Sequence, residues 1–335
     1  MQFSDKVVQW QACHGRHHLP WQQNISPYKT WVSEVMLQQT TVRTVLDYFE
    51  PFVNRFPDIP TLAQSDLESV LSYWAGLGYY RRARYLHQGA RYIADHHNST
   101  FPESYDEMIK IPGIGASTAG AIRSLAFDQN GVILDGNVKR VLTRHIGIKT
   151  PINQPSTMKQ LWQHAHTLAP TTHHRSYSQG MMDLGATVCH KQSPHCSACP
   201  LHKTCWTHQH NAYDTIPAKN IKKKVKTMRL QPVVITNGNT ILLEKQASDG
   251  LWADMWMLPN FCQHQHPHIH PLPAFQHVLT HFRISVEPLI VYSNEVPITK
   301  NNQRWTTIDD ADTPTPKIVD KCVQLALAYM KKNPS

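Results

Sequence analysis

The chain has 335 residues, which is enough for two domains that bury their own cores without disulfide support. Lys and Arg outnumber Asp and Glu by 33 to 24. The excess lies in residues 1–230, with 25 basic and 15 acidic side chains, whereas residues 231–335 hold 8 and 9. This distribution predicts a polyanion-binding domain followed by a near-neutral accessory domain, although a solvated basic surface has the same composition.

Hydropathy and cysteine usage indicate a cytoplasmic protein with no membrane partner. No apolar run approaches the roughly 18 residues that a membrane-spanning helix needs, and the amino terminus MQFSDKVVQW lacks the apolar core of a secretory signal. The seven cysteines are an odd number, and four of them lie between residues 189 and 205. That pattern fits a reducing compartment and a ligand set better than a disulfide framework.

The pattern up to about residue 205 is helical. Ser26 and Pro27 open an apolar helical segment that includes Glu34. Further on, IPGIGASTAGAI (111–122) follows a short helical stretch at 105–110 and predicts a helix, a hairpin and a second helix from about Ala116. Gly113 and Gly115 permit a tight turn whose N–H groups point outward and can hold a phosphate. An ordinary helix-helix corner is the alternative.

The cysteines form the run Cys189-x6-Cys196-x2-Cys199-x5-Cys205. Four thiolates at this spacing can surround one soft metal centre, which predicts an iron-sulfur cluster. By spacing alone, a zinc site and a set of unligated buried thiols stay open as alternatives.

The chain changes character after residue 210. Residues 211–230 are rich in Lys and poor in apolar side chains, which predicts an exposed basic linker. QPVVIT, the turn NGN and TILLEKQ then predict a β-hairpin, and FRISVEPLIVY predicts more strands, so residues 231–335 are expected to be α+β. The His-rich stretch 263–271 is interpreted as a Pro-broken polar loop, with metal binding as the alternative.

Several motifs together resemble the adenine DNA glycosylases of the MutY family, in the endonuclease III superfamily of helix-hairpin-helix repair enzymes. They are LPWQ (19–22), PYKTWVSEVMLQQT (27–40), GLGYYRRAR (76–84), IPGIGASTAGAI (111–122), ILDGNVKRVL (133–142), MMDLGATVC (181–189) and the cysteine run. The resemblance implies an all-α helix-hairpin-helix glycosylase domain at 1–210 with a [4Fe-4S] cluster in the 189–205 loop. It further implies a basic linker at 211–230 and an α+β Nudix-like domain that recognises 8-oxoguanine at 231–335.

The resemblance also implies the activity. Family enzymes hydrolyse the N-glycosidic bond of adenine mispaired with 8-oxoguanine or guanine in double-stranded DNA, after the nucleotide has flipped out of the stack. Glu34 and Asp135 match the two catalytic carboxylates; without the resemblance they are an exposed helix residue and a turn residue. Glu34 among apolar neighbours suits the acid that protonates adenine, and Asp135 suits the anion that steadies the sugar cation. We expect the chain to act as a monomer.

The remaining site residues follow from the same matches. The adenine pocket is expected to hold Trp21, Asn137 and Gln179. The expected DNA contacts are the wedge residues Gln39 and Tyr79, Thr40 and Leu77 near the opposite base, Gly113, Gly115 and Ser117 in the hairpin, and Lys139, with Arg140, at a phosphate. For Trp21 and Leu77, ordinary core packing is the alternative.

Two departures from family patterns affect the expected chemistry. Ser117 occupies the hairpin position where bifunctional relatives carry a Lys that attacks the sugar, and Ser forms no imine, so water is the expected nucleophile. The tip that reads 8-oxoguanine usually carries Phe-Ser-His, whereas this chain has Leu279, Thr280 and His281. The alternatives are a glycosylase/lyase for oxidised pyrimidines, disfavoured by Ser117, and a non-enzymatic helix-hairpin-helix module, disfavoured by the two carboxylates.

Overall fold

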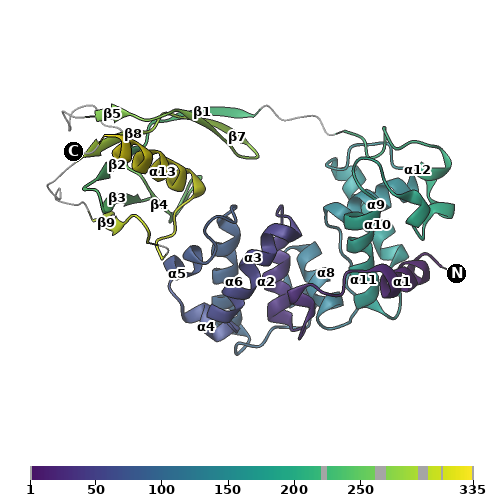
Figure 1. Ribbon diagram of the computed structural model, residues 1–335. Coiled ribbons are helices and arrows are strands. Elements are labelled where there is room, and N and C mark those ends of the chain that lie inside the picture. Colours follow the sequence, from purple (N-terminus) through teal and green to yellow (C-terminus); the bar gives the residue numbers. More distant parts are fainter. Residues whose placement is uncertain (1, 220–224, 261–268, 293–300, 311, 334–335) are drawn as a thin grey trace. The chain divides into compact units, whose positions relative to one another are not determined.

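The computed structural model describes residues 2–219, 225–260, 269–292, 301–310 and 312–333 (Figure 1). The chain forms two compact units, one of Met1–Ala63 with Gln88–Lys222 and the other of Gln64–His87 with Lys223–Ser335. Residues 64–87 come from the middle of the expected glycosylase domain, yet they cluster with the second unit.

The described residues up to 219 contain helices and no strand, as the sequence predicted. The longer helices of the first unit are α1 (Phe3–His14), α2 (Pro27–Leu37), α3 (Val42–Arg55), α4 (Ile59–Gln64), α8 (Ala116–Leu125), α9 (Gly136–Ile146), α10 (Pro155–Leu168) and α11 (His174–Asp183). Shorter turns are η1 (Pro20–Gln22), α7 (Tyr105–Met108), the π-helical η2 (Leu184–Val188), η3 (Cys196–Ala198), η4 (His202–Thr204) and α12 (Trp206–Gln209). α6 (Arg81–His96) is a single helix that begins in the second unit and continues into the first.

Local signals set the helix boundaries that matter for the site. Ser26 caps α2, because its hydroxyl accepts a hydrogen bond from the Lys29 N–H at 3.1 Å. The predicted helix-hairpin-helix unit is confirmed as α7, a turn through Gly113 with a φ of 84°, and α8. Gly113 supplies the left-handed conformation that the turn needs.

One core holds the helices around the start of α9. α1, α8, α9, α10 and α11 lie together in this part of the molecule (Figure 1). Ile133, Leu134 and Val138 are buried in a cluster with residues from these helices. Because Ile133 and Leu134 are fixed in this core, the next residue, Asp135, is delivered at its edge, where α9 begins.

The second unit combines α5 (Leu67–Ser72) with two sheets and α13 (Lys317–Lys332). β1 (Lys226–Leu230), β7 (Phe282–Val286) and β6 (Phe275–Val278) form one sheet in that order. The other has the order β4 (Trp256–Met257), β3 (Thr240–Lys245), β2 (Val233–Thr236), β8 (Leu289–Tyr292), β5 (Ile269–Pro271), and β9 (Gln303–Thr307) also pairs with β3. α13 packs against β2 (Figure 1).

The hairpin predicted around NGN is confirmed: β2 and β3 pair antiparallel, and Gly238 has a φ of 104°. The linker prediction was wrong at its end, since Lys226–Leu230 are the strand β1, paired in parallel with β7. Residues 261–268 of the His-rich region lie outside the described residues, and 269–271 are β5. No helix in the described part of the chain combines the length and apolarity that a bilayer span requires.

We predict that Gly120→Ala destabilises the first unit, because a Cβ there would lie 2.0 Å from the Val132 carbonyl oxygen. Such overpacking typically costs about 1–3 kcal/mol in unfolding free energy, measurable by urea denaturation. Gly136→Ala is the matched control, since a Cβ at Gly136 would have no neighbour within 4 Å. Equal midpoints for the two variants would contradict the close approach of α8 to Val132.

Candidate functional site

The first carboxylate of the site lies on α2. Trp31, Val32, Val35 and Met36 are buried around Glu34, whose own side chain is only partly accessible. Burial, together with the smaller effect of the negative charge of Asp135, raises the pKa of Glu34 to about 8. Glu34 therefore holds a proton at neutral pH.

The second carboxylate caps α9. Asp135 Oδ1 accepts a hydrogen bond from the Val138 N–H at 2.7 Å, and Oδ2 accepts one from Asn137 Nδ2 at 3.2 Å. The positive end of the helix dipole adds to these donors. The sequence placed Asp135 in a turn, whereas it is the N-cap of a helix of 11 residues. Its charge acts on Glu34, so the two predicted catalytic carboxylates lie close together.

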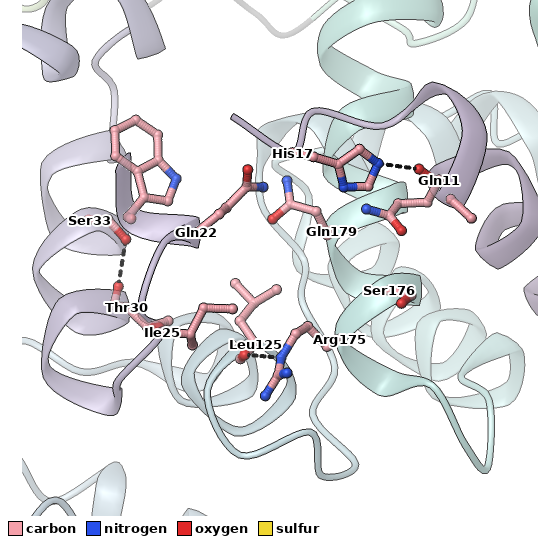
Figure 2. Close-up of a pocket in the computed structure, with 12 residues that line it drawn as sticks. Gln11, His17, Gln22, Ile25, Thr30, Ser33, Leu125, Arg175, Ser176 and Gln179 are labelled. Atoms are coloured by element: carbon pink, nitrogen blue, oxygen red, sulfur yellow. Dashed lines mark hydrogen bonds between the residues drawn. The ribbon is translucent and has the colours of Figure 1, made fainter. Parts of the chain in front are cut away.

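A cavity of about 400 Å³ opens beside α2, which is within the size range of small-molecule sites. Trp21 and Gln179, both predicted for the adenine pocket, line it, and so does Ser33, the neighbour of Glu34 along α2. In Figure 2 the Gln179 and Gln22 side chains extend toward each other across this space. The full lining is Gln11, Ala12, His17, Trp21, Gln22, Ile25, Thr30, Ser33, Leu125, Arg175, Ser176 and Gln179.

A partly buried ion pair orients Gln179. Asp183 is fully buried and accepts hydrogen bonds from the Gln179 side chain at 2.9 Å, the Arg16 Nε at 2.7 Å and the Arg16 N–H at 2.8 Å. Because the carboxylate attracts the amide nitrogen, the carbonyl oxygen of Gln179 is the end left to accept from a ligand. The cavity is thus lined by both a hydrogen-bond acceptor and the Trp21 ring.

Asn137, the third predicted pocket residue, does not line this cavity. It donates to Asp135, and its Oδ1 accepts from Arg140 Nη2 at 3.0 Å. Arg140 also donates to the carbonyl oxygens of Cys189 at 2.7 Å and Gly185 at 2.6 Å. These internal bonds were not predicted; the phosphate contact expected of Arg140, which is partly exposed, stays a prediction. Lys139 remains partly exposed on α9.

The hairpin presents the predicted anion-binding backbone. Gly113 and Gly115 are exposed, and Gly115 caps α8 with its backbone. Ser117 has a second, internal role, since its hydroxyl accepts a hydrogen bond from the Leu134 N–H at 3.1 Å. The hairpin helix is therefore tied to the segment that delivers Asp135.

Both predicted wedge residues adopt a strained backbone. Gln39, in the first unit, has a φ of 58°, and Tyr79, in the second, has a φ of 50°. For side chains of this size, the left-handed region costs of order 1–3 kcal/mol, and such strain is concentrated at functional sites. Thr40 follows Gln39 and is partly exposed, whereas Leu77 is buried.

Two residues of the second unit, Arg82 and Thr280, contact the loop that carries Tyr79. The Arg82 guanidinium lies 5.3 Å from the centre of the Tyr79 ring and donates to the Gly78 carbonyl oxygen at 3.1 Å. The Tyr79 hydroxyl forms a hydrogen bond with the Thr280 hydroxyl. The predicted wedge residue and the predicted reading tip are thus in direct contact.

Leu279, Thr280 and His281 form the turn between β6 and β7. The backbone of Leu279 pairs with that of Phe282, which leaves Thr280 and His281 exposed at the tip and Leu279 partly buried. A hairpin tip of this kind holds its polar side chains clear of the sheet.

The four clustered cysteines meet at one small cavity. Cys189, Cys196, Cys199 and Cys205 all line it, and its volume is about 30 Å³. Burial raises the pKa of the Cys199 thiol to about 12, and also raises the pKa of the Cys205 thiol. Buried thiolates need a cationic centre to offset this desolvation. Among the described residues, no three His, Cys, Asp or Glu side chains are grouped closely enough to hold a single metal ion, so the shared cavity is the observation that brings the four thiols together.

Arg144, which the sequence analysis missed, anchors the cysteine loop to α9. Its guanidinium is buried and donates to Cys189 Sγ at 3.4 Å and to the carbonyl oxygens of His190 at 2.5 Å, Lys191 at 2.9 Å and Ile216 at 3.0 Å. A cation in this position suits a negatively charged thiolate site.

Comparison with known proteins identifies the family. The adenine DNA glycosylase of Buchnera aphidicola subsp. Baizongia pistaciae (strain Bp) is 38% identical over 340 residues, which cover 95% of this chain and 96% of that protein. The chain belongs to the adenine DNA glycosylase family. It is a DNA glycosylase, and residues 32–166 match the HhH-GPD superfamily of base excision DNA repair proteins. Residues 232–325 match the NUDIX domain.

Other relatives cover parts of the chain. The human adenine DNA glycosylase is 38% identical over 216 residues, 62% of this chain and 39% of that protein. Among solved structures, a thermostable thymine-DNA glycosylase aligns with a TM-score of 0.57 at 25% identity, over 62% of this chain and 95% of that one. A non-covalent endonuclease III–DNA complex aligns with a TM-score of 0.52 at 22% identity, over 62% and 94%, which shows a shared helical fold.

Several residues that line or support the cavity were not predicted from the sequence. Gln22 follows Trp21 in the LPWQ motif, so the motif could have predicted that Gln22 also lines the cavity. Arg175, on α11, carried no such signal, and neither did the Arg16–Asp183 pair, because those two residues are 167 positions apart and meet only in the fold.

We predict that protonation of Glu34 is visible in the pH dependence of stability. Its folded pKa of about 8 exceeds the ordinary value of 4.5, so the folded state binds a proton that the unfolded state has released. The stabilisation is complete below the unfolded pKa and is lost as pH rises through the folded pKa. Glu34→Gln, which stays neutral, should therefore gain stability relative to the unsubstituted protein between about pH 5 and about pH 9 in chemical denaturation.

Glu50→Gln, on the exposed side of α3, removes the same charge and provides the control. If the difference between Glu34→Gln and the unsubstituted protein stays constant with pH, Glu34 is ionised throughout and the raised pKa is refuted.

Proposed function

We propose that this protein hydrolyses the N-glycosidic bond of adenine mispaired with 8-oxoguanine or guanine in double-stranded DNA, acting as a monofunctional glycosylase. The observation that carries the proposal is the pairing of Glu34, with its pKa raised to about 8, and Asp135 at the N-terminus of α9. Glu34 holds a proton, and Asp135 supplies a negative charge. The protein is proposed to act as a monomer.

The reaction needs both roles. Adenine leaves the sugar when a ring nitrogen receives a proton, and Glu34 is the donor that is still protonated at neutral pH. The sugar then resembles an oxocarbenium ion, which the Asp135 carboxylate stabilises, by analogy with glycoside hydrolysis. Asn137 holds Asp135 through Oδ2, so its role in the proposal is to orient the carboxylate.

The flipped base is proposed to enter the cavity beside α2. Trp21 offers an apolar ring, and the Gln179 carbonyl oxygen offers an acceptor for the exocyclic amino group of adenine. Removing a base from the stack costs a few kcal/mol, which the wedge residues Gln39 and Tyr79 are proposed to offset. Their strained backbones fit this use.

Water is the proposed nucleophile. Ser117 carries no amine, and its hydroxyl is already bonded to the Leu134 N–H. A lysine at this position could form an imine with the sugar and lead to strand cleavage, whereas a serine cannot. This argument disfavours the combined glycosylase and lyase.

DNA contacts are assigned to exposed groups on both units. Gly113 and Gly115 present backbone N–H groups for a phosphate, and Lys139 supplies a positive charge. Thr280 and His281 are proposed to read the base opposite adenine, because they are exposed polar groups at a hairpin tip. Leu279 is partly buried and is proposed to support this tip.

A [4Fe-4S] cluster is proposed as the cofactor, held by Cys189, Cys196, Cys199 and Cys205. The convergence of the four side chains on one cavity and the Arg144 cation beside Cys189 fit such a group. When bound, the cluster would cross-link the 189–205 loop. Arg140 and Arg144 would pass that rigidity to α9, since both donate to this loop.

We predict that Glu34→Gln and Asp135→Asn each lower the single-turnover rate of adenine release by about 10²-fold or more, because a positioned acid or base typically contributes 10²–10⁴-fold. Duplex binding should change little, since both groups act on charge that develops in the transition state. The measurement uses a duplex with adenine opposite 8-oxoguanine. A near-normal rate in either variant would remove that residue from its role.

We predict that the purified protein carries about four iron and four sulfide per chain. Elemental analysis and an acid-labile sulfide assay on anaerobically prepared protein measure this content. Substitution of Cys199 by Ser should lower both together. Stoichiometric zinc without sulfide would refute the cluster and favour the zinc alternative.

A further inference from the structure

A charged cluster in the second unit holds α5. Glu68, in the first turn of α5, accepts hydrogen bonds from Lys245 Nζ at 2.7 Å and Trp256 Nε1 at 2.9 Å, and Arg304 Nη1 lies 2.8 Å from Oε1. These three partners belong to β3, β4 and β9. The Glu68 side chain is 25% exposed, so its pairs are less screened than pairs on an open surface.

The cluster depends on Glu68 for its charge balance. The Arg304 guanidinium lies 4.2 Å from the centre of the Trp256 ring, and Lys245 Nζ lies 5.6 Å from a ring centre of the same residue. Two cations thus flank one tryptophan, and Glu68 is the carboxylate that both contact. Neutralising Glu68 leaves the two cations to repel each other.

A second attachment lies at the start of α6. Arg84 Nη1 donates to the Ser248 carbonyl oxygen at 2.7 Å and to Asp254 Oδ2 at 3.0 Å. Asp254 also accepts from the Ser248 hydroxyl at 2.6 Å. The segment 64–87 is therefore fastened to the β-rich part of the unit on both sides of its central loop.

The loop between these attachments carries Tyr79. Glu68 precedes it, Arg84 follows it, and the Tyr79 hydroxyl bonds to Thr280 in the β6–β7 turn. The bond between the Tyr79 and Thr280 hydroxyls forms only while the two backbone segments are held at the separation that brings the hydroxyls within hydrogen-bond distance. The attachments at Glu68 and Arg84 provide that constraint.

We propose that Glu68 is a positioning residue for partner-base selectivity. By pairing with Lys245, Trp256 and Arg304, it keeps the loop that carries Tyr79 against Thr280. The residue that reads the opposite base is thereby coupled to the wedge residue Tyr79. The inference rests on the proposed function, in which Thr280 and His281 read the opposite base. Glu68 itself takes no part in the chemistry.

The experiment compares Glu68→Gln with Glu107→Gln in the full-length protein. Glu107 is a matched control, because it pairs with Lys110 at 2.6 Å on the surface of the first unit. Single-turnover adenine release is measured opposite 8-oxoguanine and opposite guanine, and the ratio of the two rates defines the selectivity. Hydrogen exchange of peptides that cover α5 and β9 reports the attachment itself.

Glu68→Gln is expected to lower the selectivity by about 2-fold to 30-fold, the range of coupling effects from residues without ligand contact. In Glu68→Gln the rate of adenine release opposite guanine should stay unchanged, and hydrogen exchange in α5 and β9 should rise. In Glu107→Gln neither the selectivity nor the exchange in these elements should change. Arg304→Gln should reproduce the loss, and the double variant should add little to it.

Three results would overturn the inference. If exchange rises while selectivity is retained, the cluster is only structural. If Glu68→Gln loses selectivity while hydrogen exchange in α5 and β9 is unchanged, the attachment of α5 is not the cause of the selectivity. If the unsubstituted protein releases adenine equally fast opposite both bases, the proposed reading of 8-oxoguanine fails, and the inference fails with it.

Discussion

The site depends on one electrostatic arrangement: a buried carboxylic acid beside a carboxylate at a helix N-terminus. Glu34 is flanked along α2 by buried apolar residues, whereas Asp135 has the Val138 N–H and the Asn137 amide as donors. The negative charge of Asp135 helps to keep the proton on Glu34. Two identical functional groups thereby have opposite roles, which is the arrangement that acid-assisted loss of a base requires.

Much of the first unit serves to hold the start of α9. Ser117 bonds to the backbone directly before Asp135, Arg140 links Asn137 to the 185–189 segment, and Arg144 fastens the cysteine loop to the far end of the helix. Gly120 permits α8 to approach this segment closely. The hairpin, the cysteine loop and Asp135 are thus parts of one connected structure.

The sequence predicted what local signals encode. Ser26 with Pro27, the PGIG turn and the NGN turn have strong conformational preferences, and the structure has the expected elements at each. β1 was missed because its charged sequence resembles a linker and its parallel partner, β7, lies far along the chain. The internal bonds of Arg140 were not predicted, because its acceptors at Gly185 and Cys189 come together only in the fold. The same reason hid the Arg16–Asp183 pair that orients Gln179 and the contacts of Glu68.

The most direct test of the central claim is the pH dependence of adenine release under single-turnover conditions, with enzyme bound to its duplex throughout. If neutral Glu34 is the proton donor, the rate is level below its pKa of about 8 and falls tenfold per pH unit above it. A rate that falls as pH rises through the ordinary carboxyl value of 4.5 would place Glu34 in its ionised form at neutral pH and contradict the account.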